Sequence, residues 1–561
     1  MALSPGGRMA LAAIEPGALE GVGFAREAES DMVEGRLDLR RRDTLFDALE
    51  AQVFDVAVIG GGITGAGVAR DAAMRGLSVA LVEARDFASG TSSRSSKMIH
   101  GGLRYLAQGD LGLVHEAASE RKIVQAIAPH LARETPFVIP ARSAGAIARL
   151  RAGLWAFEKL GGVAKSCRHK VWSRKELAKN EPAVEVSDLA GAVVYPEYLT
   201  DDSRLTLANV RSAAAHGAVA ANYSTVTAVL SQDGRACGLE IADTLAGDGG
   251  RRARLAAKVI VNAAGPWVDA VRALEARDAP QRLRLTRGVH LVFRAERLAI
   301  SRTIIMSAAD RRGVFAVSKG AAAYIGTTDT FHPGPEPWPP ITKEDVDYLL
   351  ATAATRLPAC ALTASDIVSS WSGVRPLVAE AGKSPSEISR RDELWTGPEG
   401  MISIAGGKLT AYRRMAERVV DKIEEALGRK PSASATAASP LVGGDVAPAA
   451  LTATLEASGT APVAARRLVG LYGSEALEIA REGGDPTAEA RHAVLAEGAL
   501  TLEDYWVRRS ARAWFDVDPA CLAIESAAEA MAPLLGWSDT HKAAAIAACR
   551  AIRAASLAAS R

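Results

Sequence analysis

Metal-binding motifs are missing from this sequence. Its five cysteines are scattered without a CxxC pair, and its nine histidines form neither an HxxxH nor an HExxH pattern. Such spacings are the usual way for one segment to bring two ligands to a metal ion. We therefore expect no metal site, and we expect buried thiols without chemical roles in a reducing compartment.

Long hydrophobic runs and a strong charge imbalance are missing as well. No apolar run approaches the length of about 18 residues that a membrane-spanning helix needs. The first 35 residues also lack the continuous apolar core of a secretory signal. The net charge is +2, which gives no global attraction to nucleic acid. We expect a cytoplasmic protein in which residues 1–42 form a disordered extension.

A βαβ unit for binding a dinucleotide is the clearest feature that is present. The apolar run 56–59 meets the GxGxxG turn 60–65, an Ala-rich stretch follows, and the second apolar run 77–82 ends at Glu83. Glycines in such a turn let a pyrophosphate approach the backbone and the start of the helix. An acid about 20 residues later can accept hydrogen bonds from a ribose. The contacts predicted in this unit are Gly60, Gly62, Ile63, Thr64, Gly65 and Glu83.

A polar segment, ASGTSSRSSKMIHGGLRY, follows at 88–105. It has the periodicity of neither a helix nor a strand, so we expect a loop. Its hydroxyl groups and cations can donate hydrogen bonds to phosphates, and its paired glycines let the backbone pass close to a flat ring. The alternative is a solvated loop without a ligand.

With these residues the chain resembles the FAD-dependent sn-glycerol-3-phosphate dehydrogenases, flavoproteins of the D-amino-acid-oxidase-like superfamily. The resemblance covers about 54–410 closely and the region from 440 onward more loosely, and it implies FAD as the cofactor. The motifs that carry it are GGGITGAG (60–67), TSSRSSKMIHGGLRYL (91–106), DDSRL (201–205), NAAGPWVD (262–269), IGTTDT (325–330), SGVRPL (372–377) and GGKLTAYR (406–413).

The resemblance implies further cofactor contacts. A strand that ends in small residues near 262–267 and a glycine pair before a helix at 406–407 would let the backbone press against a cofactor. The contacts implied outside the βαβ unit are Thr91, Ser92, Ser93, Ser96, Lys97, His100, Gly101, Gly102, Val226, Ala264, Gly265, Trp267, Gly406, Gly407, Lys408, Leu409 and Thr410.

Oxidation of glycerol 3-phosphate needs cations that hold the phosphate and a base that takes the hydroxyl proton. By resemblance, the catalytic residues are His290 as the base, Arg375 and Lys408. A lone histidine on an apolar strand can instead be a core residue, and His100 is the second candidate for the base. The substrate-binding residues implied are Arg104, Tyr105, Arg375 and Lys408.

Between Phe315 and Gly326 the sequence departs from the family. Many relatives carry a Pro-aromatic pair and then a polar or acidic residue here, whereas this chain has AVSKGAAAY (316–324). Lys319 adds charge to the phosphate site if it points inward. The alternative, which we prefer, is a solvated hairpin tip.

The expected fold class is α/β, with a Rossmann-like FAD-binding domain, an antiparallel-sheet substrate domain and a C-terminal helical domain. Helical patterns lie at 111–127 and 343–356. The segment 431–450 is small, Pro-punctuated and nearly uncharged, which predicts a linker. The expected FAD-binding parts of 43–430 are about 43–140, 200–280 and 395–430, the substrate-binding parts are about 141–199 and 281–394, and the helical domain is 451–561.

The electron acceptor is inferred from chain length. The 46 residues from Asp329 to Arg375 leave no room for the large insertion of the related oxygen-using glycerophosphate oxidases. The expected reaction converts sn-glycerol 3-phosphate to dihydroxyacetone phosphate, with hydride going to flavin N5 and electrons to a membrane quinone. Peripheral contact with the cytoplasmic face of the inner membrane would use 505–514 or 542–561. The alternative for both segments is domain packing, and a homodimer stays open.

Two other functions stay open. A glycerophosphate, amine or amino-acid oxidase of the same fold would pass its electrons to oxygen. An FAD-binding protein without catalysis would keep the cofactor for structure alone, and the altered segment 318–323 gives this alternative some support.

Overall fold

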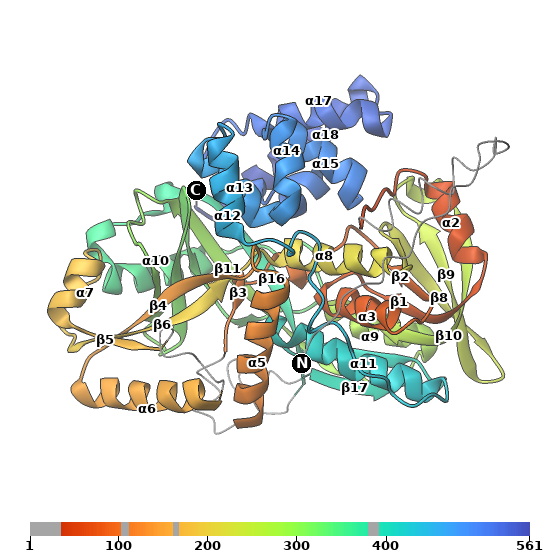
Figure 1. Cartoon of the computed structure of the whole chain (residues 1–561), viewed down its shortest axis with the longest axis horizontal. Helices are drawn as coiled ribbons and strands as arrows, with labels where there is room; N and C mark the ends of the chain where they lie inside the picture. Colours follow the sequence, from red (N-terminus) through yellow and green to blue (C-terminus); the bar gives the residue numbers. More distant parts are fainter. Residues whose placement is uncertain (1–34, 102–110, 161–167, 380–391, 561) are drawn as a thin grey trace, which may run out of the picture.

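The computed structural model describes residues 35–101, 111–160, 168–379 and 392–560. Two β-sheets lie side by side, and a group of C-terminal helices packs over them (Figure 1). The predicted α/β class is confirmed, including the helical C-terminal region. Within the described ranges, no helix combines the length and the hydrophobicity needed to cross a membrane.

The first sheet has a parallel centre, in which β1 (Val53–Ile59) lies between β10 (Arg252–Asn262) and β2 (Val79–Val82). All of β1 except its first residue is buried, as is typical of a parallel strand covered on both faces. The strand order is β17 (Asp392–Thr396), β18 (Ile402–Gly406), β10, β1, β2 and β7 (Val219–Ala221), with the hairpin β8 (Ser224–Gln232) and β9 (Arg235–Asp243) paired to β10.

Helices cover both faces of this sheet. One face shares a hydrophobic cluster with α3 (Ile63–Met74), α8 (Asp202–Ala215) and α11 (Tyr412–Ala426). The other face packs against α2 (Arg42–Glu50), which buries Phe46 and Leu49 there. The short α9 (Val268–Glu275) follows β10.

The second sheet is mostly antiparallel, as expected of the substrate domain. Among its described strand pairs, only β4 with β12 is parallel. Its order is β15 (Thr330–Phe331), β11 (Leu283–Arg294), β14 (Ala322–Gly326), β13 (Gly313–Lys319), β12 (Thr303–Ser307), β4 (Arg133–Ala141), β6 (Gly191–Leu199) and β3 (Met98–Ile99), with β16 (Ile367–Val378) on β11 and β5 (Lys170–Ser173) on β6.

Within the described ranges, four helices surround the second sheet, and a further group begins at Pro448. The four are α5 (Leu111–Ile127), α6 (Ala144–Leu160), α7 (Arg174–Asn180) and α10 (Lys343–Arg356). The C-terminal group is α12 (Pro448–Ala457), α13 (Pro462–Tyr472), α14 (Ala476–Arg481), α15 (Pro486–Glu497), a π-helical turn (Asp504–Arg509), α16 (Arg512–Phe515), α17 (Ala523–Leu535) and α18 (Asp539–Ser556).

The expected linker 431–450 is an ordered strap. It has neither helix nor strand before Pro448, but it is held against α3. Ser434 Oγ donates to Asp71 Oδ1 at 2.6 Å, and Arg70 Nη2 donates to the carbonyl of Ser439 at 2.7 Å. Buried polar groups of α3 therefore find their partners on this segment, which makes it part of the packed structure.

The expected extension 1–42 is packed at its described end. Leu37 and Leu39 are buried, and Leu37 forms a parallel bridge with Glu497 at the end of α15. The part from Gly35 onward is therefore an element between the first sheet and the C-terminal helices, because its leucines have an apolar surface to cover.

Candidate active site

A cleft of about 1470 Å³ runs between the two sheets. One part is lined by the βαβ unit, and another by side chains of the second sheet such as Phe137, Ile305 and Phe315. This volume exceeds the roughly 300–1,000 Å³ typical of sites for small ligands. The cleft is large enough for an extended dinucleotide together with a small substrate.

The glycine turn 60–65 allows a close backbone approach at the start of α3. Gly60 has a φ of +107°, and a Cβ there would lie 2.7 Å from the carbonyl oxygen of Ala263. A Cβ on Gly65 would lie 1.9 Å from the carbonyl oxygen of Gly60. Gly62 caps α3, so the first N–H groups of the helix, which have no partner within the helix, lie at the cleft edge. Gly65 acts by packing the helix onto the turn and does not itself line the cleft.

Glu83 lies at the end of β2 and lines the cleft. Its Oε2 accepts from the N–H of Gly61 at 2.7 Å, and its Oε1 accepts from the N–H of Arg85 at 2.9 Å. Burial raises the pKa of Glu83, while these two backbone hydrogen bonds lower it. The carboxylate is therefore fixed in orientation beside the turn, as a ribose acceptor must be.

The loop after Ala88 joins the two domains around the cleft. Ser92 Oγ accepts from the N–H of Ile63 at 2.9 Å, and Thr91 Oγ1 donates to the carbonyl of Val374 at 2.5 Å. The loop is thus held to the first turn of α3 on one side and to β16 on the other. Its hydroxyls serve the backbone and line the cleft as well.

The structure brings most predicted cofactor residues to this cleft and leaves four behind its wall. Lys97 is buried, and its Nζ donates to Asp202 Oδ1 at 2.5 Å; the N–H of Gly101 donates to Glu197 Oε1 at 3.0 Å. Those behind the wall are Gly65, Ser93, Lys97 and Gly101, while Gly102, Arg104 and Tyr105 lie outside the described residues. Those that line it are Gly60, Gly62, Ile63, Thr64, Glu83, Thr91, Ser92, Ser96, His100, Val226, Ala264, Gly265, Trp267, Gly406, Gly407, Lys408, Leu409 and Thr410.

Arg375 and Lys408 both line the cleft, from β16 and from the turn after β18. Arg375 Nη1 lies 3.2 Å from Asp329 Oδ1, and its Nη2 donates to Thr327 Oγ1 at 3.1 Å. Arg312 Nη1 donates to the carbonyl oxygen of Asp329 at 2.9 Å. Two guanidinium groups therefore contact one residue in the same part of the cleft.

Sequence reasoning missed Arg312, Thr327 and Asp329 as site residues. The signal was present, because Thr327 and Asp329 belong to the motif IGTTDT that carries the family resemblance. Arg312 lies in the polar segment between β12 and β13, and it belongs to none of the motifs that carry the resemblance.

His290 lies behind Ser96, outside the wall of the cleft. Its Nε2 is 2.8 Å from Ser96 Oγ, and its ring is stacked on Trp371 with 4.5 Å between centroids. Burial lowers the pKa of His290 well below its usual value, and the charges of Arg375 and Lys97 lower it further. The imidazole is therefore neutral, and its partner Ser96 lines the cleft. His100 lines the cleft itself, and its N–H donates to Thr410 Oγ1 at 3.1 Å.

Lys319 is neither at a solvated hairpin tip, which was our preferred reading, nor in the cleft wall. Its side chain is 15% exposed, and its Nζ lies 3.5 Å from Asp201 Oδ2 and 4.0 Å from the ring centre of Phe515. Burial lowers the pKa of Lys319 to about 8. Its charge belongs to a buried cluster under the C-terminal helices.

The segment 505–514, proposed from sequence as a membrane contact, packs inside the molecule. Tyr505, Trp506 and Trp514 are buried. Arg508 Nε and Arg509 Nη1 each lie 2.5 Å from Asp86 Oδ2. The membrane reading of this segment is wrong, because its arginines neutralise a buried aspartate of the first domain.

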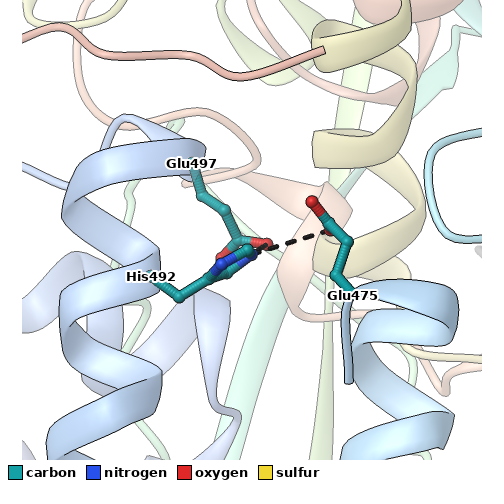
Figure 2. Close-up of side chains that lie close together, drawn as sticks. All are labelled: Glu475, His492 and Glu497. Atoms are coloured by element: carbon teal, nitrogen blue, oxygen red, sulfur yellow. Dashed lines mark ion pairs between the residues drawn. The ribbon is translucent and has the colours of Figure 1, made fainter. Parts of the chain in front are cut away.

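A cluster of two carboxylates and a histidine lies between the C-terminal helices and α8 (Figure 2). His492 Nε2 is 3.6 Å from Glu475 Oε2 and 3.7 Å from Glu497 Oε1. The spacing resembles a metal site. However, Arg211 Nη2 lies 2.6 Å from Glu475 Oε1 and Arg204 Nη2 lies 2.5 Å from Glu497 Oε1. Both carboxylates are thus neutralised by arginines, so the cluster is an ion-pair network that joins two domains.

Comparisons with known proteins agree with this geometry. The profile of the FAD dependent oxidoreductase family matches residues 55–413, and that of the C-terminal domain of alpha-glycerophosphate oxidase matches 434–542. The chain is 38% identical to the aerobic glycerol-3-phosphate dehydrogenase of Bacillus subtilis, over 91% of this chain and 96% of that one. It is 36% identical to the enzyme of the same name from Staphylococcus haemolyticus, over 90% and 95%.

Solved structures of known proteins share the fold of this chain. The glycerol-3-phosphate dehydrogenase of Bacillus halodurans, complexed with FAD, superimposes with a TM-score of 0.77 at 32% identity, covering 93% of this chain and 98% of that one. The L-alpha-glycerophosphate oxidase of Mycoplasma pneumoniae shares the fold, with a TM-score of 0.54 at 17% identity over 70% of this chain and 99% of that one.

Proposed function

The chain belongs to the family of FAD-dependent oxidoreductases that includes the aerobic glycerol-3-phosphate dehydrogenases, and we propose that it oxidises sn-glycerol 3-phosphate to dihydroxyacetone phosphate and passes the electrons to a quinone at the membrane. The observation that carries this proposal is the pair of guanidinium groups at Asp329, in a cleft whose other part has the glycine turn and Glu83.

The residues present fit FAD. The glycine turn leaves a cradle that a side chain would fill, the start of α3 provides N–H groups for a pyrophosphate, and Glu83 provides an oriented acceptor for a ribose. When bound, FAD supplies the acceptor for the hydride. The Ser- and Thr-rich loop and the turn Gly406–Thr410 would hold the rest of the cofactor.

The phosphate of the substrate is a dianion, which calls for guanidinium donors in fixed orientation. Arg375 is oriented by Asp329 and Thr327, and Arg312 is oriented by the backbone of the same aspartate. Lys408 adds a cation from the opposite sheet. We assign these groups to the phosphate.

For the base we keep His290, with Ser96 as the hydroxyl between it and the cleft. The charge of Arg375 is one cause of the lowered pKa of His290. A phosphate dianion on Arg375 would offset this charge, so substrate binding would raise the pKa of His290 and make it a better base. His100, which lines the cleft, is the alternative.

Anaerobic mixing of the FAD-loaded protein with glycerol 3-phosphate tests the reaction. Loss of the yellow flavin absorbance with this substrate, but not with glycine or proline, supports the proposal. Bleaching by the amino acids points to an amine or amino-acid oxidase, and no bleaching by any of them points to a protein that keeps FAD for structure.

The acceptor is tested by reoxidation of the reduced protein. Faster reoxidation by a short-chain quinone than by air-saturated buffer supports a dehydrogenase. The reverse order points to an oxidase that uses oxygen.

A further inference from the structure

Helix α6 (Ala144–Leu160) exposes a tryptophan in the middle of a basic face. Trp155 is 58% exposed. Residues at spacings of four and three along a helix share one face. Here every residue of that face is exposed, and the face consists of Ala144, Ala148, Arg151, Trp155 and Lys159. We call this set the α6 face.

The acidic and bulky apolar residues of α6 point the other way. Leu154 and Phe157 are buried. Glu158 is also buried, and its Oε1 lies 2.8 Å from His169 Nδ1. The α6 face therefore combines small apolar side chains, one indole ring and two cations without an acid.

The residue types of the α6 face are those that suit the interface of a lipid bilayer. Tryptophan is placed at the boundary of a bilayer because its ring is apolar and its N–H is polar. Lysine and arginine reach from such a boundary toward anionic headgroups, and each adds attraction near an anionic surface. The Nζ of Lys159 lies 5.9 Å from the ring centre of Trp155, so the cation and the indole ring occupy one patch.

Helix α6 packs on strands whose side chains line one part of the cleft. It packs on β4, β6 and α5. A Cβ on Gly101 would lie 2.2 Å from Phe157 Cζ, and His100, the residue before it, lines the cleft. The buried face of α6 thus contacts the segment that reaches the cleft wall at His100. In Figure 1, α6 lies along the lower edge of the molecule, on the side away from the C-terminal helices.

We propose that the α6 face docks on the surface of a bilayer with anionic lipids, with Trp155 in the headgroup layer and Arg151 and Lys159 beside the headgroups. The inference rests on the proposed transfer of electrons to a membrane quinone and specifies which side of the protein meets the membrane. The charge of the face argues against a second copy of this chain as its occupant, because an isologous contact would bring the same cations together.

Flotation with vesicles tests the docking surface. The FAD-loaded full chain is expected to float with vesicles of phosphatidylglycerol and phosphatidylcholine, and to stay in the dense fraction with phosphatidylcholine alone. The double variant Arg151→Glu/Lys159→Glu should lower the partition coefficient by about 30-fold or more, since two attractions are lost and two repulsions are added. Trp155→Gln should lower it roughly fivefold.

A matched double variant on α7, Lys175→Glu/Lys179→Glu, controls for overall charge. It changes the same number of exposed lysine and arginine charges in the same domain, and it should float like the parent. Equal loss in both double variants would overturn the proposal, because overall charge would then explain the binding. Size-exclusion chromatography adds a second check: a change of oligomeric state in the α6 variants without loss of flotation would assign the face to a second copy.

Failure of this inference can be told apart from failure of the proposed function. The α6 variants should reduce a soluble dye with glycerol 3-phosphate as fast as the parent. A parent that reduces the dye but does not float overturns the docking surface alone. A parent that floats through α6 without flavin reduction overturns the proposed reaction alone.

Discussion

Arg375 is held in the cleft by Asp329, whose Oδ1 lies 3.2 Å from Arg375 Nη1. The same aspartate accepts from Arg312 Nη1 through its backbone carbonyl at 2.9 Å. One residue thus orients two cations that come from different strands and loops. Arg312 also pairs with Asp310, whose Oδ2 lies 2.6 Å from its Nε. Charge-assisted hydrogen bonds to an anionic substrate group would use both guanidinium groups.

Replacing Arg375 with Ala removes one of these charge-assisted contacts. Such contacts contribute about 1.5–3 kcal/mol, so we expect kcat/KM for glycerol 3-phosphate to fall by about tenfold to 150-fold. Steady-state kinetics with a soluble dye as acceptor measures this. Arg287→Ala is the control, because Arg287 lies on the neighbouring strand β11 and pairs with Asp345 at 2.6 Å outside the cleft. Equal losses in both variants would remove Arg375 from the phosphate site.

Gly65 is where helix α3 meets the turn at Gly60. A Cβ there would lie 1.9 Å from the carbonyl oxygen of Gly60, so Gly65→Ala must push the helix start away from the turn. Overpacking of this kind costs about 1–3 kcal/mol, and the displaced N–H groups would also bind FAD less tightly. We expect a lower flavin-to-protein absorbance ratio and a lower melting temperature.

The same change at Gly334 is the control for the Gly65 variant. A Cβ on Gly334 meets no atom within 4 Å, so Gly334→Ala should keep the flavin content and the melting temperature of the parent. Full flavin content in Gly65→Ala would show that the turn tolerates the methyl group and that the close approach is not required.

The βαβ unit could be predicted from sequence because its rules are local. A glycine turn, the helix after it and the acid at the end of the second strand all lie within 30 residues, and the structure places Gly60 and Glu83 on the cleft. The helices at 111–127 and 343–356 also have the predicted bounds. Apolar residues that recur with the period of a helix predict such helices from the local sequence alone, without knowledge of distant contacts.

Partners distant in sequence explain the errors. Lys319 lies beside Asp201, and Arg509 pairs with Asp86, which is 423 positions away. A charged residue without a visible partner is expected on the surface, so both residues were assigned to solvent or to a membrane. The position of Ser96 between His290 and the cleft could not be predicted either, because these two residues are 194 positions apart in the sequence.

His130 gives the protein a predictable loss of stability in acid. It is buried, and burial lowers its pKa to about 3. The unfolded chain binds a proton at the usual value near 6.5, so between about pH 6.5 and 3 the unfolded state binds more protons and the native state loses stability as pH falls. At pH 5 this amounts to about 2 kcal/mol.

The variant His130→Gln should therefore show a shallower decline in stability than the parent between pH 7 and pH 5. Thermal unfolding across this range measures the slope of stability against pH. The slopes are compared rather than the absolute stabilities, because the substitution also changes packing. His541→Gln, at an exposed position of α18, leaves the buried histidines intact and should keep the slope of the parent. Identical slopes in parent and His130→Gln would show that His130 is not held neutral in the native state.

The pair Arg204–Glu497 joins α8 to the C-terminal helices. Glu497 is fully buried, and Arg204 Nη2 lies 2.5 Å from its Oε1. Arg204→Ala would leave a buried carboxylate short of its partner, which costs about 3–5 kcal/mol. We expect a calorimetric transition at a lower temperature and faster proteolysis between the domains. Arg204→Lys should be intermediate, because it keeps the charge but loses the two-pronged contact.

The control is Arg36→Ala, which breaks the half-exposed pair with Glu478 on the same side of the interface and should cost at most about 1 kcal/mol. If the two alanine variants melt alike, the buried pair Arg204–Glu497 does not hold the C-terminal helices in place.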